Sequence, residues 1–236
     1  MNDTYRIADR NIRIVSQFGF VHVYCKDYRT ECEPDFTIEI TDDDINVEQK
    51  KTQNQGCLGG WLEVFAVYRK IAEQMPKYDR FLIHGSAVAV DGEGYLFTAK
   101  SGTGKSTHVK LWREIFGDRA VMVNDDKPII GISENGATIY GTPCDGKERL
   151  SNNIAVPLKA ICILERSEQN QILEISASEA YPIIIQQTYH PSNPEMLNKT
   201  LELLDRMRVL VKFYRLSCNM EREAAEISYN AMKGQN

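Results

Sequence analysis

Short apolar runs and longer blocks with helical periodicity follow one another along the chain, a pattern that predicts an α/β protein. The strand-like runs are brief and are bounded by polar or glycine-containing turns. We expect strands at residues 5–8, 12–15, 20–24, 36–40, 81–83, 86–90, 95–98, 120–123, 129–132, 137–140, 156–164, 172–175 and 209–216. Apolar spacings of three and four predict helices at residues 60–75, 105–116, 178–189, 195–207 and 221–232.

The first predicted helix, residues 60–75, is amphipathic and is expected to pack its apolar face on the core. Pro76 ends it, because proline cannot continue a helix. The preceding stretch, residues 41–56, is acidic and polar and is expected to be a solvated loop. The apolar face of the helix consists of Trp61, Phe65, Tyr68, Ala72 and Met75.

Together these elements predict a mixed central β-sheet with flanking helices. Residues 1–78 are expected to form a β-rich accessory region followed by the first helix, and residues 79–236 to form the core. A chain of 236 residues can hold one large domain or a domain with an appendage. The pattern alone leaves open whether residues 1–78 are separate or belong to the same domain.

The segment AKSGTGKS, residues 99–106, has the spacing of a phosphate-binding loop between a predicted strand and a predicted helix. Two glycines let the backbone N–H groups turn inward and, with the helix N-terminus, surround phosphate oxygens. Lys105 is expected to reach the β- and γ-phosphates, and Ser106 to hold Mg²⁺. The alternative is a glycine-rich turn without a ligand. The candidate nucleotide-binding residues are Ser101, Gly102, Thr103, Gly104, Lys105, Ser106 and Thr107.

Two adjacent carboxylates, Asp125 and Asp126, follow the predicted strand at residues 120–123. A right-handed β-α-β crossover makes this strand parallel to residues 95–98, so its carboxyl end opens on the side of the phosphate loop. Phosphoryl transfer uses one acid to hold Mg²⁺ and another to accept the proton of the attacking hydroxyl. A surface turn that uses aspartate for its turn propensity is the alternative.

A histidine is expected beside the loop. The turn at residues 91–94 predicts a hairpin that pairs Ser86 with Ala99, and the same antiparallel count brings His84 to about the level of Ser101. The alternative is a histidine that bonds the backbone at a strand edge.

A second hairpin is predicted at residues 129–140, with its turn at Glu134-Asn135-Gly136. It leads the segment GTPCDGKERL, residues 141–150, back toward Asp126. Lys147 and Arg149 could bind phosphate or an anionic acceptor there, and Asp145 and Glu148 could assist the metal or orient those cations. A charged, merely solvated loop is the alternative.

Composition excludes several functions. A net charge of −5 argues against nucleic acid as the main partner. The longest apolar runs are far shorter than the ~20 residues that cross a bilayer. The N-terminus has no apolar signal-peptide core, so a cytoplasmic protein is expected. The six scattered cysteines have no C-x-x-C pair and are expected to be reduced thiols.

The run HGSAVAVDGEGYLFTAKSGTGKSTHVKLW, followed by VMVNDDKPII, resembles the core of the HPr kinase/phosphorylase family and its smaller relatives, some of which are encoded with peptide-modification clusters. The resemblance covers residues 81–164 and implies a phosphoenolpyruvate carboxykinase-like P-loop kinase core that uses ATP and Mg²⁺. It further implies that Asp125 is the base, that Asp126 is its metal-side partner and that His84 supports the base.

The sequence departs from that family in three places. Thr107 stands where HPr kinases usually have Glu, Thr138 stands where they place a metal-binding Glu, and GTPCDGKERL replaces their glycine-rich docking signature. HPr itself is therefore not expected as the acceptor.

Three functions remain open on this basis. The first is a kinase that phosphorylates a hydroxyl of a peptide, small protein or small molecule. The second is a nucleotide-binding regulator or peptide chaperone without phosphotransfer. The third is a carboxykinase-like phosphotransferase that acts on an enolate. A second copy of the chain is a further partner to consider in each case.

Overall fold

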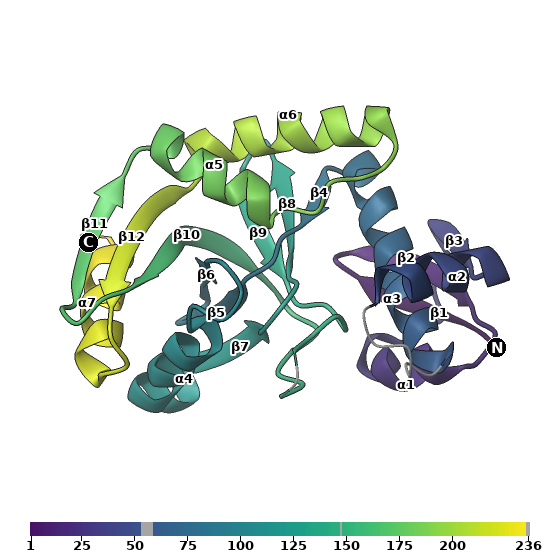
Figure 1. Cartoon of the computed structure of the whole chain (residues 1–236), viewed down its shortest axis with the longest axis horizontal. Helices are drawn as coiled ribbons and strands as arrows, with labels where there is room; N and C mark the ends of the chain where they lie inside the picture. Colours follow the sequence, from purple (N-terminus) through teal and green to yellow (C-terminus); the bar gives the residue numbers. More distant parts are fainter. Residues whose placement is uncertain (53–58, 147, 235–236) are drawn as a thin grey trace.

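The computed structural model describes residues 1–52, 59–146 and 148–234, and it contains two β-sheets (Figure 1). The smaller sheet has the order β1-β2-β3, with β1 antiparallel and β3 parallel to β2. Three helices accompany it. The elements of this N-terminal region are β1 (Asn2–Ile7), β2 (Arg10–Val15), α1 (Phe20–Tyr24), β3 (Phe36–Glu39), α2 (Asp42–Lys51) and α3 (Gly59–Gln74).

The larger sheet has nine strands and mixed directions. Seven strands follow the order β4-β8-β9-β10-β6-β5-β7, and β12 pairs with both β10 and β11. The strands are β4 (Arg80–Leu82), β5 (Ser86–Val90), β6 (Glu93–Thr98), β7 (Ala120–Asn124), β8 (Ile129–Ser133), β9 (Gly136–Tyr140), β10 (Ala155–Arg166), β11 (Gln171–Ile175) and β12 (Lys212–Cys218).

The long strand β10 connects the two parts of this sheet. Its first residues pair antiparallel with β9, and its later residues pair in parallel with β6 and β12. On the other side of β6, β5 is antiparallel to both β6 and β7. The strands β6, β7, β10 and β12 therefore run in the same direction, and their carboxyl ends share one edge of the sheet.

Helices cover both faces of the larger sheet (Figure 1). One face packs on α5 (Ala177–Gln187) and α6 (Pro194–Leu210), and the other on α4 (Lys105–Phe116) and α7 (Arg222–Met232). Period-two alternation in β6 accounts for this, because Leu96 joins the first core while Tyr95 and Phe97 join the second. The expected mixed sheet with flanking helices is confirmed.

A third core joins the N-terminal region to the sheet. Leu82, Ile129 and Tyr140 of the larger sheet pack with apolar residues of β1, β2 and α3. Hydrogen bonds cross the same junction, since Tyr68 Oη donates to the Pro143 carbonyl over 2.7 Å and Tyr189 Oη donates to Glu73 over 2.8 Å.

Several sequence expectations in the N-terminal region are wrong. Residues 20–24 form helix α1 instead of a strand. Residues 42–51 of the expected loop form helix α2, which Thr41 and Asp44 begin with reciprocal capping bonds. The rest of that stretch, from residue 53 to residue 56, lies outside the described residues. Helix α3 forms as expected, but Trp61 and Phe65 on its apolar face remain 38 % and 41 % exposed.

One strand pairing also differs. The turn of the β5–β6 hairpin is the two-residue Asp91-Gly92, with positive φ at both positions, so Ser86 pairs with Phe97 and not with Ala99. Strand β11 pairs antiparallel with β12. The β8–β9 register is confirmed, with Ile129 opposite Tyr140. Within the described part of the chain, no helix is both long and apolar enough to cross a membrane.

Candidate functional site

The phosphate-loop motif lies where β6 ends and α4 begins. Strand β6 stops at Thr98 and the helix starts at Lys105. The loop needs its glycines, because Gly102 has φ 78° and Gly104 has φ 121°, a backbone conformation that other residues rarely adopt. A Cβ at either position would meet no heavy atom within 4 Å, so the loop borders open space on this side.

The first turn of α4 faces the same volume. The first N–H groups of a helix have no intrahelical acceptor and favour an anion. The side chains of Ser101, Ser106 and Thr107 are exposed, as ligand-binding groups must be. The helix direction is fixed at its other side, where the buried Trp112 Nε1 donates to Ser228 Oγ of α7 over 2.9 Å.

Lys105 is held under the loop. Its side chain is 8 % exposed, and Nζ donates to the Ala99 carbonyl over 3.1 Å. Burial lowers the pKa of Lys105, and the nearby charge of Asp126 acts in the opposite direction. A bound phosphate would supply the second negative partner that this ammonium group lacks.

Asn124 orders the two aspartates that follow β7. It is fully buried, and its Oδ1 accepts the N–H groups of Asp126 over 2.8 Å and Lys127 over 2.7 Å. Its Nδ2 donates to the Thr142 carbonyl over 2.9 Å, which ties the aspartates to the segment 141–149. One amide side chain thereby fixes both the acidic turn and the loop beside it.

Asp125 points toward that loop. It is 8 % exposed, and its Oδ1 accepts the Gly146 N–H over 2.6 Å. A Cβ on Gly146 would come within 2.7 Å of Asp125 Oδ2, so a larger residue at 146 would displace this carboxylate. Burial raises the pKa of Asp125, and the charge of Asp145 adds to this, whereas the Gly146 bond opposes it. The result is a carboxylate with increased affinity for a proton.

The Asp126 carboxylate points toward His84 and Lys127. Its Oδ1 lies 3.5 Å from His84 Nε2, and its Oδ2 lies 3.1 Å from Lys127 Nζ. The other ring nitrogen, His84 Nδ1, lies 2.9 Å from Gln187 Oε1. Burial and the charge of Lys105 lower the pKa of His84, which favours the neutral ring. The histidine thus contacts Asp126, not Asp125 as the resemblance implied.

The hairpin shift moves His84 only slightly. Thr98 Oγ1 donates to the His84 carbonyl over 2.8 Å, so the histidine lies level with Ala99 instead of Ser101. The histidine is still close enough to Lys105 for the charge of that lysine to lower its pKa. Lys105, Asp126 and His84 are therefore brought together, with Asp125 behind them.

The segment 141–150 does return to the aspartates. Lys147 lies outside the described residues, and Glu148 is exposed. Arg149 has a positive φ of 55°, pairs with Asp145 over 3.1 Å and stacks on Tyr24, with its guanidinium carbon 3.8 Å from the ring centroid. Among these three candidates, Arg149 has a defined contact, which links the loop to α1.

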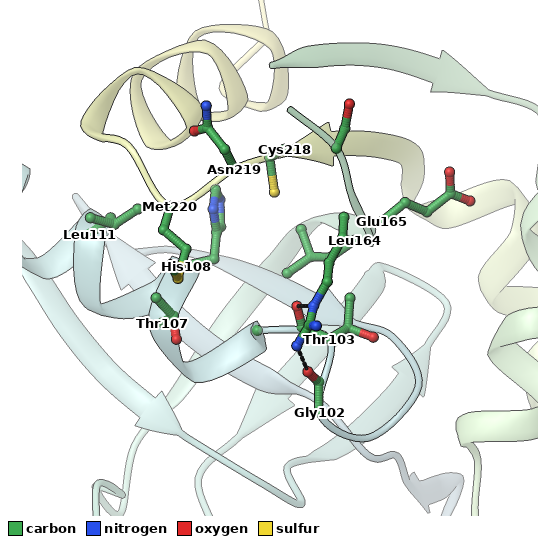
Figure 2. Close-up of a pocket in the computed structure, with 13 residues that line it drawn as sticks. Gly102, Thr103, Thr107, His108, Leu111, Leu164, Glu165, Cys218, Asn219 and Met220 are labelled. Atoms are coloured by element: carbon green, nitrogen blue, oxygen red, sulfur yellow. Dashed lines mark hydrogen bonds between the residues drawn. The ribbon is translucent and has the colours of Figure 1, made fainter. Parts of the chain in front are cut away.

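A cavity of about 450 Å³ opens beside the phosphate loop, between the loop and the ends of β10 and β12 (Figure 2). It lies at the carboxyl ends of β6, β10 and β12, the position where ligands bind in open α/β sheets. Arg166 Nε donates to the Thr103 carbonyl over 3.2 Å, and its Nη2 donates to the Gly102 carbonyl. The apolar part of the lining comprises Leu111, Leu164 and Met220.

Sequence reasoning overlooked Asn124, Gln187 and Arg166. The latter two come from elements far from the motif in sequence, so no local spacing identifies them. Asn124 directly precedes the aspartates, and its place at the end of a buried strand was the available signal. Thr138 pairs with Gly131 in mid-sheet and lines a separate cavity, away from the aspartates.

In the part of the chain that the structure describes, no three or more His, Cys, Asp or Glu side chains gather as metal ligands. The cysteines Cys25, Cys32, Cys144, Cys162 and Cys218 are free thiols, as expected, and Cys57 lies outside the described residues.

A strand, a glycine-rich loop with the phosphate-loop motif and a helix, set in a mixed sheet with helices on both faces, define an α/β protein. The sequence profile of the SynChlorMet cassette protein ScmC family matches residues 46–224, and the chain belongs to this family. The HPr(Ser) kinase/phosphatase from Coxiella burnetii is similar at 11% identity and a TM-score of 0.33, over 65% of this chain and 99% of that one. No curated protein matches.

Proposed function

We propose that the protein is an ATP- and Mg²⁺-dependent kinase that transfers the γ-phosphoryl group to a hydroxyl. The observation that carries this proposal is that Lys105, at the start of α4, and Asp126, after the end of β7, lie at the same edge of the sheet, close enough for the charge of Asp126 to act on the pKa of Lys105. A triphosphate would lie at this edge, between the loop and the acids.

The residues at this edge fit Mg·ATP. The open space over Gly102 and Gly104 would admit the phosphates, and Lys105 would hold the β- and γ-phosphates. Ser106 and Asp126 would hold Mg²⁺, which neutralises the charge that develops on the transferred group. Ser101, Thr103 and Thr107 would complete the loop contacts. The cavity at the ends of β10 and β12 would accept the nucleoside.

Asp125 acts as the general base. Its raised pKa suits a group that must take up the hydroxyl proton during transfer. The acceptor oxygen forms a bond to the γ-phosphorus, the bond from that phosphorus to ADP breaks, and the hydroxyl proton passes to the Asp125 carboxylate. His84, fixed by Gln187, orients Asp126 through their contact.

A nucleotide-binding regulator is the second candidate, and one observation favours it. The Asp125 carboxylate already accepts the Gly146 N–H and lies 8 % exposed, so the acid is engaged within the protein. A regulator would use nucleotide occupancy to move the 141–149 segment without transferring phosphate. Asp125→Asn separates the two, because a kinase loses transfer and keeps nucleotide, whereas a regulator changes little.

Lys105→Ala tests the nucleotide site itself. We expect calorimetry to show Mg·ATP binding weakened by about 100-fold or more, and incubation with γ-labelled ATP to show no transfer. Lys110→Ala is the matched control, because Lys110 lies on the same helix, is exposed and pairs only weakly with Glu114 over 4.0 Å. Normal Mg·ATP binding by Lys105→Ala would refute the loop assignment.

A further inference from the structure

A second cavity, of about 360 Å³, opens beside the aspartates on the side away from the nucleoside cavity. Its floor consists of Asp126, Lys127 and the segment from Pro143 to Gly146. Its walls come from two helices of the N-terminal region, α1 and α3. We call it the aromatic cleft, after the wall residues Tyr24, Trp61, Phe65 and Tyr68.

The walls of the aromatic cleft are preorganised rings. The Trp61 ring packs at a tilt against Tyr24, with centroids 5.3 Å apart, and against Phe65, with centroids 6.3 Å apart. Arg149 closes one end by stacking on Tyr24. Rings held in this way lose little entropy on binding and favour an apolar or aromatic occupant.

The polar groups around the floor are already engaged. Asp126 faces Lys127 and His84, Asp145 pairs with Arg149, and the Tyr68 hydroxyl donates to a carbonyl. A polyhydroxylated metabolite would need several unpaired polar partners, which these residues do not offer. The cleft therefore suits a hydroxyl that is flanked by an apolar group.

Apolar surface also continues beyond the cleft. Trp61 and Phe65, four residues apart on α3, are 38 % and 41 % exposed although their helical spacing is that of a core face. Phe18 is 57 % exposed and its ring lies against Gly59, two residues before Trp61. An exposed apolar strip of this kind is typical of a surface that binds another chain.

We propose that the aromatic cleft binds the phosphoryl acceptor, and that this acceptor is a peptide segment whose hydroxyl-bearing residue is next to an aromatic or large aliphatic side chain. The assignment rests on the proposed kinase activity for the fate of the hydroxyl, but binding in the cleft does not require it. The apolar side chain packs on Trp61 and Phe65, and the hydroxyl points to the floor at Asp126 and Gly146, whose N–H the Asp125 carboxylate accepts.

The test is calorimetric titration of the full chain with two matched nonapeptides, with and without Mg·AMP-PNP. One peptide has a central serine between two phenylalanines, and the other has alanines in place of the phenylalanines. We expect only the first to bind, and Trp61→Ala or Phe65→Ala to weaken it by about tenfold or more. Trp61→Phe retains a ring and should recover most of the affinity.

Leu173→Ala is the control, because Leu173 is 54 % exposed on β11, far in sequence from both helices. Thermal melting of each variant identifies any loss of folding, and Phe65→Ala, which removes the more exposed ring, is decisive if Trp61→Ala unfolds. Equal binding of both peptides, no binding of either, or undiminished binding by Phe65→Ala would overturn the proposal. Phosphorylation of small-molecule hydroxyls in preference to the phenylalanine peptide would overturn it too.

The proposal and the kinase assignment fail separately. Loss of the nucleotide site in Lys105→Ala leaves peptide titration in the absence of nucleotide unaffected. Conversely, an intact Mg·ATP titration with no peptide binding refutes the cleft alone.

Discussion

The protein contains two acidic clusters in which the buried aspartates have opposite pKa shifts. In the N-terminal region, Asp44 of α2 accepts bonds from Lys70 Nζ over 2.6 Å and Arg69 Nη2 over 3.1 Å, and from the Thr41 backbone over 3.0 Å. Burial acts to raise the pKa of Asp44, but these bonds outweigh it and bring the pKa well below its usual range. The negative charge of Asp44 is therefore balanced by Lys70 and Arg69.

The acidic turn after β7 differs from this cluster at Asp125. Asp125 is as buried as Asp44, yet no salt bridge within 4.0 Å reaches it from the described residues, and burial raises its pKa. A buried acid with raised pKa beside a phosphate loop is typical of a functional site, whereas a fully paired acid is typical of structural support. The same residue type thus serves stability in one region and, we propose, chemistry in the other.

The largest expected difference between the clusters is in turnover. Asp125→Asn should reduce phosphoryl transfer by about 100- to 10,000-fold, because general acid–base groups contribute in that range, while Mg·ATP still binds. Asp44→Asn should leave transfer within about twofold, since it lies outside the site. Single-turnover transfer from γ-labelled ATP measures both, and equal losses in the two variants would remove the distinction.

We expect the effects of the two substitutions on the free energy of unfolding to have the reverse order. Asp44→Asn removes the charge that Lys70 and Arg69 share, and it should lower the free energy of unfolding by about 1–3 kcal/mol. Asp125→Asn removes a charge that the fold disfavours, so it should be nearly neutral or slightly stabilising. Urea denaturation provides both values. A strongly destabilised Asp125→Asn would instead show that the Gly146 bond is structural.

The pH dependence of unfolding should differ in sign. The lowered pKa of Asp44 stabilises the fold above the ordinary pKa of an aspartate, about 3.9, and this contribution is lost as the pH falls through the folded-state pKa. The raised pKa of Asp125 penalises the fold at neutral pH, and the penalty disappears as the pH falls. Urea midpoints measured from pH 7 to pH 3 should therefore converge with wild type from above for Asp125→Asn, whereas Asp44→Asn should stay below wild type at pH 3 and approach it only at still lower pH.

The smallest expected effect concerns Arg166. It is exposed and donates only to backbone carbonyls of the phosphate loop, so solvent screens its charge. Arg166→Ala should weaken Mg·ATP binding by about three- to tenfold without changing the unfolding midpoint, and Arg166→Lys should not recover the paired geometry. Calorimetric Kd values test this, and unchanged affinity in Arg166→Ala would show that the loop needs no such support.

The core was more predictable from sequence than the N-terminal region, for a physical reason. Helix α4 and the β8–β9 hairpin follow local patterns, a loop motif and a turn signal, that also decide the structure. Helix α1 is a five-residue apolar segment whose helical form depends on packing against α3. An apolar run of that length is equally compatible with a strand. Helix α2 had a local signal in the Thr41–Asp44 cap, which the acidic composition obscured.

The site was predictable to the extent that it is local. The phosphate loop and the acidic turn could be located, because each follows a buried strand. The partner of His84 could not, since Gln187 comes from a distant helix and the hairpin turn shifts the register by two residues. The exposed rings of α3 could not be distinguished from core residues, because helical spacing shows which face is apolar but not what covers it.

The most direct test of the central claim is a crystal structure of the full chain with Mg·AMP-PNP. We expect the β- and γ-phosphates on the loop N–H groups and Lys105, the metal between those phosphates, Ser106 and Asp126, and the Asp125 carboxylate next to the γ-phosphate. A nucleotide bound away from the loop, or a metal with no contact to either Ser106 or Asp126, would contradict the proposed site.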